Sequence, residues 1–144
     1  MLAKDYQSNV DMDLIVFGSY FHGMIAEHEV EIAEFLKSSS LSEDRIRLVI
    51  RVAKESLKEE VPKMLEGKIA HDAHLVEGGK TFMVVKSLVT GSLRGQSLEE
   101  TIEYLENSVI GKFNCYLPRS QKIYAEKERF ARRFLVQLKK DIGL

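Results

Sequence analysis

The chain has 144 residues, of which 44% are hydrophobic and 30% are charged, and its net charge is −1. This balance is typical of a globular protein with a buried core and excludes an intrinsically disordered chain. Apolar runs stay far below the ~18 residues that a membrane-spanning helix needs, so we expect no membrane association.

The cysteine content and the N-terminus indicate the compartment. Cys115 is the only cysteine, so no intrachain disulfide can form, which fits a reducing environment. The first residues lack the basic region and apolar run of a signal peptide. We therefore expect a cytoplasmic protein, and the length predicts a single domain over residues 1–144.

The strongest helical pattern covers residues 14–36. Its apolar residues recur at intervals close to ~3.6 residues, as on the core-facing side of an amphipathic helix. At ~1.5 Å per residue such a helix would be roughly 35 Å long. We predict one helix over this range, preceded by an irregular segment over residues 1–10. The row on its core-facing side consists of Leu14, Phe21, His28 and Phe35.

A second helix is predicted to begin after Ser40. Ser40 and Glu43 have the spacing of a capping box, in which each side chain accepts a hydrogen bond from the other residue's backbone N–H. Apolar residues then recur at helical spacing from Ile46 to Val61. Because the connection between the first two helices is short, we expect them to be antiparallel neighbours.

Pro62 interrupts the second helix. Proline is tolerated in the first turn of a helix but not in its interior, so we predict a kinked or restarted helix that continues to His74. Gly78 and Gly79 predict a C-terminal cap for it. Residues 81–89 have the composition of either a strand or a helix, and because no second strand is evident we predict a helix.

The C-terminal part contains two further predicted helices. Gly91 and Gly95 are expected to bound a loop, after which Ser97 and Glu100 form another capping box. The last helix is expected over residues 120–141. Together these elements predict an all-α fold, a single-domain helical bundle of four to six helices whose first two helices are antiparallel.

Three histidines are candidate metal ligands. His28 lies in the apolar row of the first predicted helix, where a buried imidazole needs a hydrogen-bond partner or a metal ion. His71 and His74 lie three residues apart, and with His28 they would bind a divalent metal if the helices bring them together. The spacing matches no known metal-binding signature. A satisfied core His28 with His71 and His74 at the surface is therefore the favoured interpretation.

Positive charge is concentrated at the C-terminus. From Pro118 onward there are eight Lys and Arg residues and three Asp and Glu residues, a net charge of +5. A basic helix can contact phosphates, so nucleic acid or another anion is a candidate partner. The isoelectric point of about 6.4 argues against a dedicated nucleic-acid binder and favours a solvated face, or a contact with an acidic helix of a second subunit. The candidate contact residues are Lys122, Arg129, Arg132, Arg133 and Lys140.

Small and aromatic residues on the first predicted helix indicate self-association. Gly18, Gly23 and Ala26 leave room for another helix to approach closely, and Tyr20 is of a type enriched at interfaces. Since small helical proteins commonly form symmetric dimers, we expect a homodimer or higher homo-oligomer. No catalytic motif is evident, so the leading hypothesis is a non-enzymatic protein that acts through protein–protein contacts. Metal or small-molecule binding and nucleic-acid binding are the alternatives.

Overall fold

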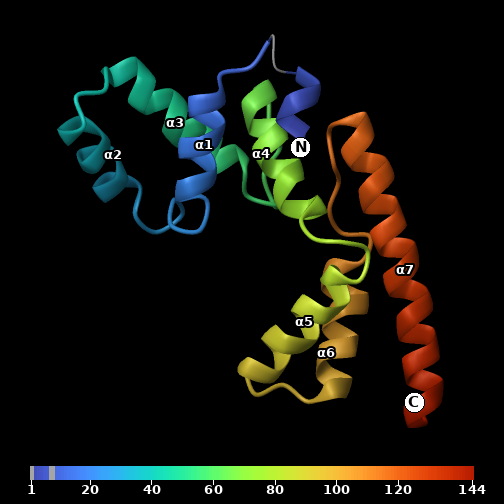
Figure 1. Cartoon of the computed structure of the whole chain (residues 1–144). Helices are drawn as coiled ribbons and strands as arrows, with labels where there is room; N and C mark the ends of the chain where they lie inside the picture. Colours follow the sequence, from blue (N-terminus) through green and yellow to red (C-terminus); the bar gives the residue numbers. More distant parts are fainter. Residues whose placement is uncertain (1, 7–8) are drawn as a thin grey trace. The chain divides into compact units, whose positions relative to one another are not determined.

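The chain folds as two compact units. The computed structural model describes residues 2–6 and 9–144, and every regular element in this part is helical, which confirms the all-α class (Figure 1). Unit 1 comprises Met1–Leu75 with Cys115–Leu117, and unit 2 comprises Val76–Asn114 with Pro118–Leu144. A single domain over residues 1–144 stays a prediction.

Unit 1 contains a short 3₁₀-helix and four α-helices. The 3₁₀-helix occupies Leu2–Tyr6 of the segment 1–10 that was expected to be irregular, residues 9 and 10 are not helical, and residues 1, 7 and 8 lie outside the described residues. The helices are η1 (Leu2–Tyr6), α1 (Met12–Phe21), α2 (Glu29–Ser38), α3 (Glu43–Glu55) and α4 (Leu65–Val76), whose last residue belongs to unit 2.

The predicted helix over residues 14–36 is two helices. A turn over residues 22–27 separates α1 from α2, and both helices pack against α3. At ~1.5 Å per residue, α3 is only about 20 Å long, so an unbroken helix over 14–36 would extend past it. The turn therefore allows α2 to fold back, so that Ile25 and Ile32 both reach the core against α3. The expected antiparallel pair is not found as two helices, because the first predicted helix is divided into α1 and α2.

The core of unit 1 is built around α3. Val49, Val52 and Ala53 have no exposed surface, and they pack among the buried aliphatic and aromatic side chains of α1, α2 and α4. The other buried members of this cluster are Leu14, Phe21, Ile25, Ile32, Leu36, Ile46 and Ala70.

Gly18 allows α1 and α3 to approach closely. A Cβ atom at this position would lie 2.5 Å from Cγ1 of Val52 and 3.2 Å from the backbone N of Ala53. Gly23 has open space around it instead. The close helix approach predicted from these small residues is thus made at Gly18 by another helix of the same chain.

The start and the end of α3 both differ from the prediction. Ser42, not Ser40, is the N-cap, since its side chain accepts a hydrogen bond from the backbone N–H of Arg45 at 3.3 Å. Ser40 has a positive φ of 59°, which turns the chain between α2 and α3. The helix stops at Glu55, seven residues before Pro62, because the Glu55 carboxylate accepts a hydrogen bond from the backbone N–H of Met64 at 3.0 Å and the chain turns there.

Unit 2 contains three α-helices and one π-helical segment. The helix predicted over residues 81–89 is confirmed, and α5 packs against both α6 and α7. The π-helical segment extends α6 without a break, since the N–H of Ile110 donates to the carbonyl of Leu105 five residues earlier. The helices are α5 (Phe82–Leu93), α6 (Leu98–Tyr104), the π-helical η2 (Leu105–Val109) and α7 (Pro118–Ile142).

Several helix boundaries in unit 2 follow their sequence signals. Ser97 and Glu100 form the predicted capping box, and Gly78, with φ of 68°, follows the end of α4 as expected for a C-terminal cap. Pro118 occupies the first position of α7. Gly91 is different, because it lies inside α5, buried against Thr101, and does not open a loop. The described part has seven α-helices where four to six were predicted, since residues 14–36 contain two.

We predict opposite effects of the same substitution at two glycines of unit 1. Alanine favours a helix by about 1 kcal/mol over glycine, but at Gly18 its methyl group would meet α3. Gly18→Ala should therefore lower the free energy of unfolding by about 1–3 kcal/mol, and Gly23→Ala should leave it unchanged or raise it slightly. Thermal unfolding followed by circular dichroism measures both, and equal melting temperatures for the two variants would contradict the close packing.

Candidate functional site

The histidine expected in the core is at the surface. His28 is the residue before α2, its side chain is 55% exposed, and its Nδ1 lies 3.9 Å from the Glu31 carboxylate. The break between α1 and α2 explains this, because His28 no longer continues the apolar row of α1. The two histidines of α4 also differ from the favoured interpretation, since His71 is buried and only His74 is partly exposed.

These three histidines do not form a metal-ligand group. Within residues 2–6 and 9–144, no cluster of three or more His, Cys, Asp or Glu side chains could hold a metal ion. The structure therefore offers no coordination set at His28, His71 and His74. Binding of a divalent metal or a small molecule stays an untested prediction.

His22 contacts His74 instead of His28. Their ring centroids lie 4.5 Å apart with the planes tilted by 42°. The hydroxyl of Ser56 donates its proton to the carbonyl of Ala53 at 2.6 Å, so it can only accept from Nδ1 of His22, at 2.8 Å. This fixes a proton on Nδ1 of His22. Residue spacing does not predict this pair, because His22 lies in the turn that follows α1, and the local signal for that turn was the adjacent Gly23, which weakens a helix.

A buried carboxylate holds a distant segment against α4. Asp72 is fully buried, and its carboxylate accepts hydrogen bonds from the backbone N–H groups of Tyr116 (3.0 Å) and Leu117 (2.8 Å). It also accepts from Nδ1 of His71 at 3.2 Å, and Nε2 of His71 is buried with no hydrogen-bond partner among the described residues. The ring of Tyr116 packs edge-on against this imidazole at 5.0 Å.

This Asp–His pair acts as a structural anchor. A carboxylate that orients an imidazole is common in catalytic sites, but there the second ring nitrogen faces the substrate. Here His71 is only 1% exposed, so a solute cannot reach Nε2 without local opening. No role was predicted for Asp72 from the sequence. The signal was an acidic residue between Ala70 and Leu75 on an apolar helix face, which is typical of a buried polar contact.

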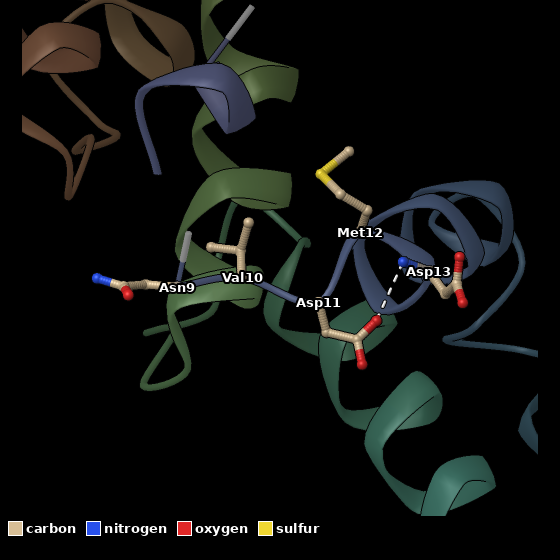
Figure 2. A pocket seen from close by; sticks show the side chains of 5 residues that line it. All are labelled: Asn9, Val10, Asp11, Met12 and Asp13. Carbon is tan, nitrogen blue, oxygen red and sulfur yellow. Dashed lines mark hydrogen bonds between the residues drawn. The ribbon is translucent and has the colours of Figure 1, made fainter. Parts of the chain in front are cut away.

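An ion pair caps α1 at the edge of a shallow depression. The depression has a volume of about 510 Å³ and is lined by five consecutive residues, Asn9 to Asp13 (Figure 2). The Asp11 carboxylate accepts hydrogen bonds from the backbone N–H groups of Asp13 and Leu14, and it forms a bidentate pair with Arg45. These contacts, the Arg45 hydrogen bond above all, lower the pKa of Asp11 to about 2 and raise the pKa of Arg45. The Asp11 carboxylate therefore has a structural role, since it caps α1 and pairs with Arg45.

The predicted anion contacts lie on the exposed side of α7. All five candidate residues are exposed. Arg132 also lies close to Gly111. Lys139, in contrast, pairs with Glu106 at 3.0 Å. The structure therefore keeps Lys122, Arg129, Arg132, Arg133 and Lys140 available to solvent.

An apolar surface lies on α1, on the side opposite the core of unit 1. Met12, Val16 and Tyr20 recur every four residues along it, with Phe17 beside them and Met24 following in the turn. All five side chains are exposed, Tyr20 by 72%. We call these five residues the α1 face. Tyr20 packs edge-on against the buried ring of Phe21 (5.2 Å), which in turn contacts Phe35 of α2 (6.3 Å).

Comparisons with models of known protein families, with curated proteins and with solved structures give no match. In the part of the chain that the structure describes, no helix is long and apolar enough to cross a membrane.

We predict that Asp72→Ala strongly destabilises unit 1. The substitution leaves two buried backbone N–H groups without an acceptor, which should lower the free energy of unfolding by about 2–4 kcal/mol. Asp44→Ala is the matched control, because Asp44 is exposed and pairs only with Arg47 at the surface, so its loss should cost less than about 1 kcal/mol. Urea unfolding measures both values, and similar values for the two variants would contradict the anchor.

We also predict a pH-dependent effect of Asp11→Asn. Because the pKa of Asp11 is lowered from 3.8 to about 2 in the folded protein, its stabilising contribution is fully present above about pH 4 and is lost as the pH falls towards 2. The variant should therefore be less stable than the original chain at neutral pH, and the difference should shrink between about pH 4 and 2. Urea midpoints across this range test this, and a constant difference would contradict it.

Proposed function

We propose that this protein is a non-enzymatic helical protein that acts through protein–protein contacts and associates with a second copy of itself. The observation that carries the proposal is the α1 face, defined above. A helix of a monomeric protein normally presents polar residues to solvent, whereas α1 is apolar on nearly all sides. A helix of this kind is typical of one that is covered on both faces.

The composition of the α1 face favours an identical partner. Asp13 is the only charged residue within α1, and it lies near the first turn, where Arg45 pairs with it at 3.6 Å. In a symmetric dimer the same surface meets itself, so any uncompensated charge would oppose its own copy. An uncharged apolar surface avoids this conflict, while methionine and aromatic side chains adapt readily to a partner.

The size of the α1 face predicts a weak dimer. Five partly exposed side chains, at roughly 100 Å² each, offer on the order of 500 Å² per copy, so a dimer would bury on the order of 1,000 Å². This is the lower limit for a specific interface, and interfaces of this size are typical of weak or transient contacts. We also propose a cytoplasmic location, which the single cysteine supports.

The proposal is tested by sedimentation equilibrium of the full chain between about 5 and 500 µM. The original chain should shift from monomer to dimer across this range. Val16→Glu should weaken the dimer at least tenfold, because it places two carboxylates of the same sign in one apolar interface. Val16 is more than half exposed, so the folded monomer should tolerate a glutamate at this position.

Val61→Glu is the matched control, since Val61 is equally exposed, lies in the same unit and is not part of the α1 face. It should leave the dimer unchanged. A chain that stays monomeric at hundreds of micromolar, or equal weakening by both variants, would contradict self-association through α1.

A further inference from the structure

The longest helix of unit 2 has two sharply different sides. One side of α7 packs into the unit, and its buried residues recur at helical spacing. Even the lysine on this side is buried, and its ammonium group donates a hydrogen bond to the carbonyl of Glu77 at 2.6 Å. The buried residues are Ser120, Tyr124, Lys127, Ala131 and Leu135.

The opposite side of α7 carries a straight row of cations. Lys122, Arg129, Arg133 and Lys140 are separated by seven, four and seven residues. At ~3.6 residues per turn these intervals place all four within roughly 40° of one another around the helix, and they span roughly 27 Å along it. We call these four residues the basic row. All four residues are exposed to solvent.

The basic row has no acidic partners in the described part of the chain. None of its four side chains makes an ion pair there, whereas Lys139, one residue before the last of them, pairs with Glu106. Lys122 and Arg129 flank a shallow hollow of about 430 Å³ on the same helix, which Glu126 and the small Ala125 also line. Glu126 is the acidic residue nearest the row, so the row and this neighbour together carry a net charge of +3.

Charge is also divided between the two units. Unit 2 contains twelve Lys and Arg and eight Asp and Glu residues, a net charge of +4, while unit 1 has nine and fourteen, a net charge of −5. The nearly neutral whole chain thus conceals a basic unit. The isoelectric point of about 6.4, which argued against a nucleic-acid binder, says little about the local field along α7.

We propose that the basic row binds the phosphate backbone of double-stranded nucleic acid. A row of like charges roughly 27 Å long corresponds to about eight base pairs of axial rise in a duplex, each strand of which carries one phosphate per base pair. Two of its four members are arginines, which bind phosphates through two parallel hydrogen bonds. An anionic membrane surface is disfavoured, because a surface-bound helix inserts its apolar side, and that side of α7 is buried in unit 2.

The test uses fluorescence anisotropy with a labelled 20-base-pair DNA duplex and the full chain, at salt concentrations from about 50 to 200 mM. Four phosphate contacts predict that the logarithm of the association constant falls with the logarithm of salt concentration with a slope of about −3.6. Arg129→Ala combined with Arg133→Ala should reduce the slope to about −1.8 and weaken binding on the order of tenfold for each residue.

The matched control removes two other exposed cations of unit 2, by Arg94→Ala combined with Lys112→Ala. It has the same net charge as the α7 double variant and should bind the duplex within about twofold of the original chain. An RNA duplex of the same length distinguishes the two sources of this phosphate chemistry. Circular dichroism verifies that both double variants keep their helices.

Three outcomes would overturn the proposal. The first is no salt-sensitive binding to either duplex, and the second is equal weakening by the two double variants, which would indicate attraction to the whole unit. The third is binding to vesicles that contain phosphatidylserine but not to the duplexes, which would assign the basic row to membranes.

Discussion

The structure of unit 1 depends on one buried carboxylate. Asp72 joins α4 to a segment that lies 44 residues further along the chain, through the backbone N–H groups of Tyr116 and Leu117. Cys115–Leu117 thereby belongs to unit 1, although the chain on both sides of this segment belongs to unit 2, and the Tyr116 hydroxyl adds a longer hydrogen bond to the carbonyl of Glu60 at 3.4 Å. Burying a carboxylate is costly, and the cost is met here because each hydrogen-bond donor near it is itself a buried group that needs an acceptor. The anchor therefore satisfies both partners at once, because the Asp72 carboxylate and the N–H groups that donate to it would each destabilise the fold if they were left unpaired.

The rest of unit 1 is arranged around α3. The chain before it turns twice, at residues 22–27 and at Ser40, and so packs two helices against α3 in place of one. Gly18 brings α1 close enough for Val52 to fill the space that a side chain would occupy. The consequence is that α1 buries one side fully and leaves its other side, which is also apolar, at the surface.

Local signals in the sequence were sufficient for most helices. The capping box at Ser97, the glycine after α4 and Pro118 at the start of α7 all act through neighbouring backbone groups, so their spacing alone locates the helix ends. The break after Phe21 had one local signal, Gly23, but the apolar spacing continues across it and so favours an unbroken helix. The prediction of a buried His28 was wrong for the same reason. The break places His22 against His74 and leaves His28 exposed, which a continuous helix does not predict. The cations of α7 were named from the sequence as candidate contacts, which stays a prediction, and their alignment opposite a buried face required the helix to be placed.

The two proposed surfaces obey different physical rules and would reinforce each other. Association through the α1 face is driven by apolar burial, which salt does not weaken, while the basic row relies on charge, which salt screens. A dimer formed through α1 contains two copies of α7, so binding of the first to a long duplex raises the effective concentration of the second. The apparent affinity for a long duplex should then rise steeply as the protein concentration passes the dissociation constant of the dimer. A short duplex that accommodates one α7 should show no such rise, because the second copy has no phosphates to contact.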